Sequence, residues 1–281
     1  MHVHTIHSGM CTVPVLRAVC RESYTPPEAL YERLKSEGMD LVTVTDHDSI
    51  EAAEALRRHS DFFLSEEVTC QMPSGTKIHL GVYDITERQH IEIQRRRKDI
   101  ESLAAYLDSE NLFFTINHVF SRLTGRRDLS DFGHFSALFP GVETLNGHML
   151  RSLNQQSAEL ASSLGKAAVA GSDAHTLASA GLAWTSAPGA RNKTEFLERV
   201  RRGRASVCGA SGSYGKLTAD VLRICSALVK ENPAAVLLAP LALAVPVVVA
   251  MNYLLEAAFA WRWARTLEWA RPRTRFGEVQ P

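Results

Sequence analysis

The stretch LVTVTDHD, residues 41–48, decides the fold class, because an apolar, β-branched run ends directly in ionisable side chains. The first four residues have the composition of a buried strand. Asp46, His47 and Asp48 follow at the point where such a strand would end. In parallel α/β folds and barrels, functional sites are built at the carboxyl ends of the strands. The stretch therefore predicts one strand of an α/β fold with a functional site at its end.

The same order, a short apolar run followed by an ionisable residue, recurs as far as about residue 210. Candidate strands alternate with amphipathic helical stretches, which is the pattern of a mostly parallel sheet or barrel. Thr25-Pro26-Pro27-Glu28 predicts a helix start with a capping box and proline in the first turn, and Gly38 predicts the end of that helix. Asn192-Lys193-Thr194-Glu195 predicts the start of another helix. The candidate strands are residues 41–44, 62–64, 77–82, 112–116, 142–145, 167–170 and 205–208.

The composition limits the partners that the chain can take. Its 281 residues include 31 Lys+Arg and 31 Asp+Glu, for a formal net charge of +0. A neutral chain lacks the basic surface that binds long nucleic acid, so a small or single-ended substrate is favoured over a long duplex. The five cysteines form no CxxC pair, which argues against a disulfide framework and favours a reducing compartment. Because His-Val-His follows Met1, no secretory signal peptide is expected.

The character of the chain changes after Lys216. Residues 233–255 contain no charged side chain, and roughly 20 apolar residues can cross a bilayer as a helix. Pro240 and Pro246 would kink such a helix without excluding it. The alternatives are a tail anchor, a buried helical pair or an oligomer interface. Location is accordingly expected to be cytoplasmic or membrane-associated, with the orientation open. Arginines follow the run and favour a cytoplasmic C-terminus: Arg262, Arg265, Arg271, Arg273 and Arg275.

The string HVHTIHSG, residues 2–9, is the first candidate metal-binding motif. Residues two apart on an extended strand point to the same face, so His2 and His4 can present two imidazoles to one ion. His7 follows three residues later. An HxH pair alone is a weak signal.

Four further motifs lie in or after candidate strands: TDHD at 45–48, SEEV at 65–68 with IHLG at 78–81, NH at 117–118 and GSDAH at 171–175. Each alone could be a turn, a helix cap or a core residue. A carboxylate can bridge two metal ions, which a neutral imidazole cannot, and Glu67 is the better candidate for that bridge. Glu66 is expected to be solvated or to lie behind the ligands. Together with HxH, the set favours one metal site.

In this order the motifs resemble those of PHP (polymerase and histidinol phosphatase) domains, over residues 2 to about 175. The resemblance implies a distorted (β/α)7 TIM-like barrel, here followed by a hydrophobic helical tail, so we expect domains at 1–212 and 213–281. It also implies two or three divalent ions, and nitrogen and oxygen ligands suit zinc, manganese or iron. The ligand sets it implies are His2, His4, Glu67 and Asp173 for one metal, Glu67, His79 and His118 for a second, and His7, His47 and His175 for a third.

The chain departs from the family pattern at its start. In that family a barrel strand, often ending in Asp, precedes HxH, whereas His2 follows Met1 directly. Either the recorded start lies too far downstream or the first strand is incomplete, and both alternatives affect barrel closure and the geometry around His2.

Other residues are candidates for roles around the metals. Asp46 is a candidate for orienting a ligand or for proton transfer. A guanidinium forks onto phosphate oxygens, and three arginines follow His118: Arg122, Arg126 and Arg127. The histidines outside any motif are expected to be surface or core residues: His59, His90, His134 and His148.

These residues favour hydrolysis of a small phosphomonoester, such as a nucleotide, a sugar phosphate or histidinol phosphate, by metal-activated water. Cleavage of an amide or carbamate on the same scaffold is the alternative within the hydrolases. A nuclease is disfavoured by the neutral charge balance. A non-enzymatic, membrane-tethered protein with structural metals is disfavoured because structural zinc sites are usually four-coordinate and thiolate-rich.

Overall fold

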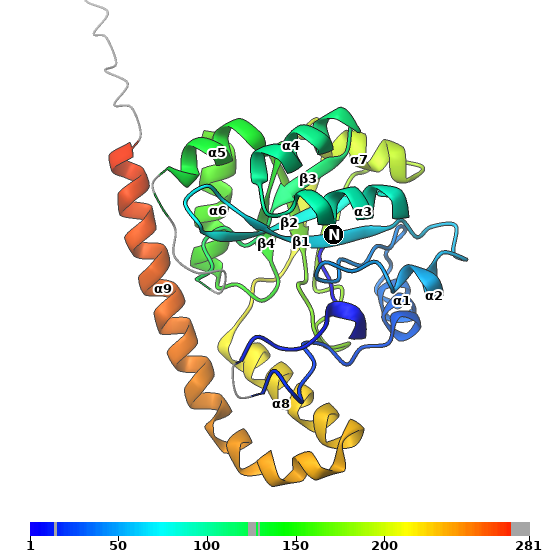
Figure 1. Cartoon of the computed structure of the whole chain (residues 1–281), viewed down its shortest axis with the longest axis vertical. Coiled ribbons are helices and arrows are strands. Elements are labelled where there is room, and N and C mark those ends of the chain that lie inside the picture. The colour runs from blue at the N-terminus through cyan, green and yellow to red at the C-terminus, as the bar shows by residue number, and fades with distance from the viewer. Residues whose placement is uncertain (14–15, 123–127, 129, 271–281) are drawn as a thin grey trace, which may run out of the picture.

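A computed structural model describes residues 1–13, 16–122, 128 and 130–270 of the chain (Figure 1). A five-stranded sheet, in the order β1-β2-β3-β4-β5, forms the centre of a mixed α/β fold. Its strands are β1 (Ser65–Gln71), β2 (Lys77–Tyr83), β3 (Phe113–Ile116), β4 (Gly141–Asn146) and β5 (Ala167–Gly171). A second sheet pairs β6 (Ala183–Ser186) with β7 (Ser206–Gly209).

Helices surround the central sheet (Figure 1). Those of the first 212 residues are η1 (Ile6–Ser8), α1 (Pro27–Ser36), α2 (Ala53–Leu56), α3 (Glu87–Arg96), α4 (Ile100–Ser109), α5 (Asp131–Leu138), α6 (Arg151–Ser163) and α7 (Lys193–Arg201). The helix start predicted at Asn192 is confirmed, because its side chain accepts a 2.9 Å hydrogen bond from Glu195 N. The capping box predicted at Thr25 is wrong, since Pro26 caps α1 without a side-chain hydrogen bond.

The expectation of a mostly parallel sheet holds for only part of it. β3, β4 and β5 are parallel neighbours, whereas β2 is antiparallel to both β1 and β3. Only residues 72–76, which include Pro73 and Gly75, connect β1 to β2. Parallel pairing needs a crossover of a dozen or more residues, so this short connection forces a hairpin.

A closed seven-stranded barrel is not found in the described part of the chain. Between β5 and β1, the backbone makes only isolated bridges, at Val3–Ala174, Val42–Phe62 and His47–Glu67. Side chains take backbone donors that a regular ladder would use: Thr5 N donates to Asp46 Oδ1 at 2.6 Å, and Val3 N to Thr45 Oγ1 at 3.0 Å. The segments 41–44 and 62–64 are consequently irregular, whereas the sequence predicts strands there.

The main hydrophobic core lies between the central sheet and the helices that cover it. α4 shows how the sequence builds it, because its residues at helical spacing are buried: Ile100, Leu103, Ala104 and Leu107. The Asp99 side chain accepts hydrogen bonds from the backbone of Glu101 and Ser102 and so begins the helix. Burial of this one face holds α4 against β3 and fixes the strand end from which His118 projects.

The tail consists of α8 (Tyr214–Glu231), η2 (Pro233–Ala244) and α9 (Val245–Ala270). α9 runs along one side of the molecule (Figure 1), and its Trp263 belongs to the main core. The segment Pro233–Trp263 has a mean hydropathy of 2.5 and is 17% buried. By length and composition alone, it is the one helical segment among the described residues that could cross a membrane. An apolar C-terminal helix is weak support for membrane association.

Candidate metal centre

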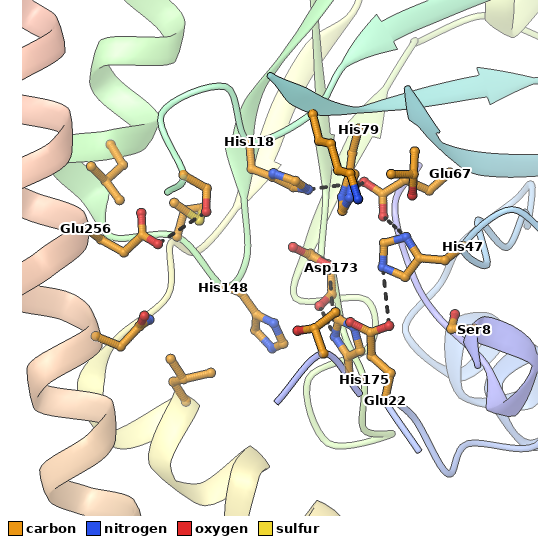
Figure 2. A pocket seen from close by; sticks show the side chains of 18 of the residues that line it. Ser8, Glu22, His47, Glu67, His79, His118, His148, Asp173, His175 and Glu256 are labelled. Atoms are coloured by element: carbon orange, nitrogen blue, oxygen red, sulfur yellow. Dashed lines mark hydrogen bonds and ion pairs between the residues drawn. The ribbon is translucent and has the colours of Figure 1, made fainter. Parts of the chain in front are cut away.

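Polar side chains from separate segments of the chain converge on one cavity beside the ends of β3 and β5 (Figure 2). Every ligand predicted from the sequence, except His7, belongs to a group of residues able to hold an ion together. The residues brought together are His2, His4, His47, Glu67, His79, His118, Asp173 and His175.

Four of these side chains form the first group. His2 Nε2 lies 3.0 Å from His4 Nε2 and 3.1 Å from Glu67 Oε2. Asp173 Oδ1 lies 3.2 Å from His4 Nε2 and 3.4 Å from His2 Nε2. A tetrahedral ion with bonds of about 2.0–2.2 Å keeps its ligands about 3.4 Å apart. The group therefore has the spacing of ligands around a single ion.

Glu67 also faces a second group through its other oxygen. Glu67 Oε1 lies 3.2 Å from His118 Nε2 and 3.5 Å from His79 Nδ1, while its Oε2 lies 3.2 Å from His47 Nδ1. The Asn117 side chain donates to Glu67 Oε1 at 2.9 Å and fixes the carboxylate plane. One carboxylate thus stands between two sets of imidazoles, as a bridging ligand must.

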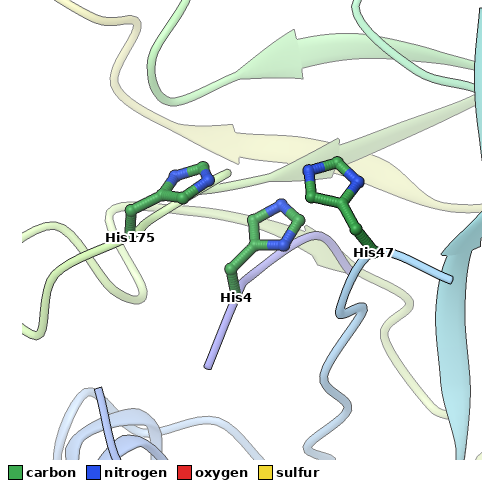
Figure 3. Close-up of side chains that lie close together, drawn as sticks. All are labelled: His4, His47 and His175. Carbon is green, nitrogen blue, oxygen red and sulfur yellow. The ribbon is translucent and has the colours of Figure 1, made fainter. Parts of the chain in front are cut away.

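His4, His47 and His175 form a third group, with stacked rings (Figure 3). The ring of His4 lies 4.6 Å from that of His47 and 4.4 Å from that of His175, centroid to centroid. The partner that sequence reasoning missed is Glu22, whose two oxygens lie 3.5 Å from His47 Nε2 and 3.5 Å from His175 Nε2. No motif surrounds Glu22 in the sequence, so only the fold reveals it.

The structure does not bring His7 into the third group. Its Nδ1 lies 2.9 Å from Oε2 of the exposed Glu51. Thr5 caps the 3-10 turn η1 by accepting a hydrogen bond from His7 N at 3.2 Å. His7 is therefore out of the extended register that aligns His2 with His4.

Glu143 fixes the orientation of two ligands from behind. Its Oε1 lies 2.8 Å from His2 Nδ1, and its Oε2 accepts from His118 N at 2.9 Å. Asn146 Nδ2 lies 2.9 Å from both Glu143 Oε2 and Asp173 Oδ2, which links this support to a third ligand. A carboxylate on the second nitrogen of a ligating histidine sets its tautomer and raises its basicity.

Replacing Glu143 with Gln should weaken metal binding by about 10- to 100-fold, because outer partners of ligating histidines contribute that much. Titration of the apo protein with zinc or manganese would measure the change. Glu159→Gln is the matched control, since Glu159 lies on the exposed face of α6. Equal affinity in both variants would show that Glu143 does not support the ligands.

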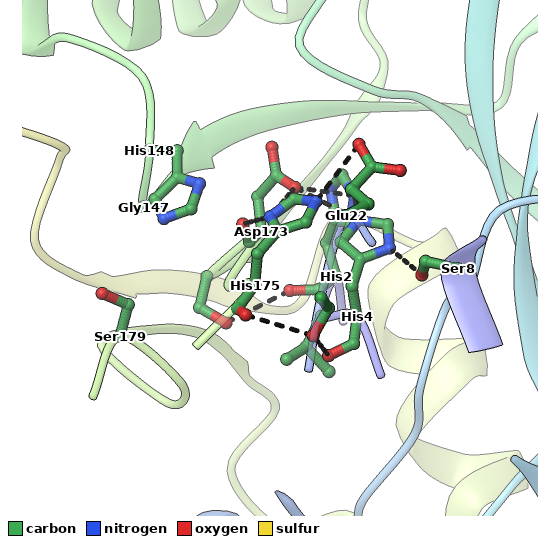
Figure 4. Close-up of polar contacts among 12 residues, drawn as sticks. His2, His4, Ser8, Glu22, Gly147, His148, Asp173, His175 and Ser179 are labelled. Carbon is green, nitrogen blue, oxygen red and sulfur yellow. Dashed lines mark hydrogen bonds and ion pairs between the residues drawn. The ribbon is translucent and has the colours of Figure 1, made fainter. Parts of the chain in front are cut away.

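Asp46 lies behind the cluster rather than in the cavity. It accepts hydrogen bonds from Thr5 N, Thr5 Oγ1 and Ser8 Oγ, each at 2.6 Å. Ser8 Oγ lies 2.9 Å from His4 Nδ1 (Figure 4), so Asp46 orients His4 through Ser8. This geometry favours the orienting role over proton transfer to a substrate.

Burial and the neighbouring charges together shift the pKa values of the buried ligands. Burial lowers the pKa of His2, but the carboxylates of Glu67 and Asp173 outweigh it and hold that pKa well above its ordinary value. Burial and the neighbouring His175 lower the pKa of His4 to about 3. Burial raises the pKa of Glu67, but His2 and His47 outweigh it and hold that pKa well below the ordinary value. Glu67 is therefore anionic and His4 neutral, the forms that bind metal, whereas His2 must release a proton when it binds an ion.

Two ligands have a backbone conformation that is unusual outside glycine. His118 has φ 27° and Asp173 has φ 48°. Such residues cost about 1–3 kcal/mol each and gather at functional sites. His118 N donates to Glu143 and Asp173 N donates to the His2 carbonyl at 2.8 Å, and these bonds hold both turns.

Buried polar atoms in the cluster test whether metal ions fit. Glu67 Oε2, His79 Nδ1 and His175 Nε2 are buried and make no hydrogen bond of good geometry with described residues. Buried polar atoms are nearly always paired, and divalent cations would supply the missing partners of these ligand atoms. The donor set, histidine and carboxylate without thiolate, fits zinc, manganese or iron.

The cavity has a volume of about 430 Å³, and the assigned ligands that line it are Glu22, His47, Glu67, His79, His118, Asp173 and His175. The sequence-predicted arginines do not line it: Arg122 is exposed outside the cavity, and Arg126 and Arg127 lie outside the described residues. Lys77, at the start of β2, is the cation found among the described lining residues.

His148 also lines the cavity, contrary to the expectation that it is an ordinary surface or core histidine. Together with Asp173 and His175 it forms a further group able to hold an ion. Its Nε2 lies 3.3 Å from Asp220 Oδ2 on α8. Asp220 also accepts from Thr176 Oγ1 at 2.7 Å and from Ser179 Oγ, so α8 holds the loop that follows His175.

The comparisons with known proteins agree with this fold. A family model described as PHP-associated matches residues 151–205. Comparison with curated protein sequences gives no significant match. The solved structure of PsfC from Pseudomonas syringae is similar, at 17% identity, with a TM-score of 0.59, over 80% of this chain and 96% of that one.

A second similar structure is the lesion-specific endonuclease PfuEndoQ from Pyrococcus furiosus. It shares 15% identity, with a TM-score of 0.50, over 74% of this chain and 56% of that chain. At these identities the likenesses establish the fold alone, and the convergent histidines and carboxylates define a candidate metal site. The PHP-associated model matches residues 151–205, which agrees with the family resemblance of the motifs in the first 175 residues.

Proposed function

We propose that this chain hydrolyses a small phosphomonoester with two or three divalent metal ions held by the cluster. The observation that carries the proposal is Glu67, whose two oxygens face two separate sets of imidazoles. Bound divalent ions would acidify a water molecule and polarise the phosphoryl oxygens. The ligands we assign are His2, His4, Glu67 and Asp173 to one ion, Glu67, His79 and His118 to a second, and His47, His175 and Glu22 to a third.

Residues around the ligands hold the ligand side chains in position by hydrogen bonds. Asn117 and Glu143 fix Glu67 and His2 by hydrogen bonds of 2.9 Å and 2.8 Å. Asp46 holds His4 through Ser8. These contacts preorganise the cluster before substrate enters, which is the largest contribution a protein makes to reactions of this kind.

Lys77 is the residue that we assign to phosphate binding from the protein side. A lysine ammonium is a point charge that binds phosphate without forked geometry. Lys77→Met should raise KM about tenfold and leave the metal content unchanged, because the side chain belongs to no metal-ligand group. Lys98→Met, at an exposed position outside the cavity, is the matched control. An unchanged KM would remove Lys77 from the site.

The proposal is tested on the purified full chain by metal analysis and by phosphate release from a panel of nucleotides, sugar phosphates and histidinol phosphate. We expect two to three equivalents of transition metal and release that stops on chelation and returns when metal is added. Metal without phosphate release would overturn the proposal in favour of carbonyl-directed hydrolysis. Absence of bound metal would overturn the assigned ligands.

A further inference from the structure

The lining of the cavity combines two kinds of side chain. Besides the histidines and carboxylates of the metal centre it contains apolar side chains, and α9 also contributes the polar Asn252 and Glu256. The apolar residues come from α6 and the turn before it, and from the two tail helices: Met149, Leu150, Leu153, Leu217 and Tyr253. A phosphate placed at the metals would therefore direct its alcohol toward an apolar wall.

α9 belongs to that wall and has two apolar faces. Its inner face is buried against the protein at helical spacing: Val245, Val249, Tyr253, Ala260 and Trp263. The opposite face is also apolar and lies in the open: Val247 at 68%, Val248 at 62%, Met251 at 54% and Leu254 at 67% exposed. A helix that is apolar all round is normally buried in a protein or in lipid.

The preceding helix continues the exposed apolar surface. Leu237 and Leu243 of η2 are 82% and 85% exposed. Residues 233–255 contain no charge, and in the sequence Arg262 and Arg265 follow the run; the further arginines at 271, 273 and 275 lie outside the described residues. Apolar side chains that enter the acyl region and a basic segment for anionic headgroups are the two parts of a peripheral membrane site.

α9 is fixed to the metal centre and does not stand alone as a membrane-crossing helix. The buried Glu256 accepts hydrogen bonds from Ser121 Oγ at 3.3 Å and Arg122 N at 2.9 Å. Both donors follow His118 closely in sequence. Because the inner face packs on the protein, only the outer face is available to lipid, which favours docking on one leaflet.

We propose that the outer face of η2 and α9 docks in a lipid bilayer and that the cavity takes a phosphomonoester whose alcohol is apolar, supplied from that bilayer. The proposal rests on the proposed phosphomonoesterase activity and names its substrate class. Lipid beside Met251 and Leu254 would be separated from the cavity only by the width of α9, since a helix is about 10 Å across. The same helix thus contacts the bilayer with one face and the substrate's alcohol with the other.

The test uses the metal-loaded full chain with vesicles of phosphatidylcholine and phosphatidylglycerol, with or without phosphatidic acid. We expect the protein to float with vesicles and to release phosphate from phosphatidic acid with kcat/KM about 100-fold above that for glycerol 3-phosphate, because several CH2 groups become buried. The double variant Val248→Glu and Leu254→Glu should lower vesicle binding and lipid hydrolysis at least about tenfold. Its hydrolysis of glycerol 3-phosphate should stay unchanged.

Ile91→Glu is the matched control, because Ile91 is 51% exposed on α3, away from the tail. Hydrolysis of glycerol 3-phosphate without vesicle binding would overturn this inference and leave the proposed function standing. Self-association of the chain that the double variant abolishes would also overturn it, by assigning the exposed face to a second copy. Failure on both substrates would overturn the proposed function, and this inference with it.

Discussion

Replacing Glu67 with Gln should lower kcat/KM for any substrate by at least about 10⁴-fold and remove about one equivalent of bound metal. Glu67 is fully buried and its oxygens lie within 3.5 Å of His2, His4, His47, His79 and His118. The amide keeps the size of the carboxyl but loses the charge that bridges two cations. Metal analysis and phosphate release on the same preparation would measure both effects.

Glu66→Gln is the matched control for this change. Glu66 is the neighbouring residue on β1 and is just as buried, but successive strand residues point to opposite faces. Its Oε2 lies 2.9 Å from His90 Nδ1 and 2.8 Å from Gln94 Nε2, so it is neither solvated nor behind the ligands. Full metal content in the Glu67 variant, or equal losses in both variants, would contradict the assignment of Glu67 as the bridge.

Strand-end chemistry made the metal ligands predictable from the sequence. His118 and Asp173 follow short apolar strands whose carboxyl ends lie at one edge of the sheet, so alternation of apolar runs and polar residues was enough to bring them together. Glu67 was selected because only a carboxylate can bridge, and its position between imidazoles fits that reasoning. Local pattern and general chemistry thus predicted one site, whereas the division of its residues into ligand sets came from the family resemblance.

Long-range contacts explain what sequence reasoning missed. Glu22 reaches His175 across more than half of the chain, and no local motif encodes such a contact. Asp220, on helix α8 of the tail, holds His148 in position beside the cavity. The barrel failed to close for a related reason, because side chains of Thr45 and Asp46 take the backbone donors of Val3 and Thr5. Spacing along a sequence does not show such competition.

The chemistry of the third group depends on Glu22, and its removal gives the second large effect we expect. Glu22→Gln should lower kcat by about 10³-fold and release about one equivalent of metal, while the first two ions stay bound. The carboxylate lies 3.5 Å from both His47 and His175 and supplies the negative charge of that group. A metal ion that stabilises transition-state charge contributes several kcal/mol, which corresponds to this factor.

His7→Ala separates this assignment from the ligand set implied by the family resemblance. His7 pairs with the exposed Glu51 and lies outside the metal-ligand groups of the described residues, so its removal should change kcat less than about threefold and leave the metal content intact. Metal analysis of both variants, with zinc and manganese added in turn, shows whether Glu22 or His7 belongs to the third group. This measurement does not depend on turnover. Loss of metal in His7→Ala with full metal in Glu22→Gln would reverse the assignment. The third ion would then need a conformation in which η1 turns His7 toward His47.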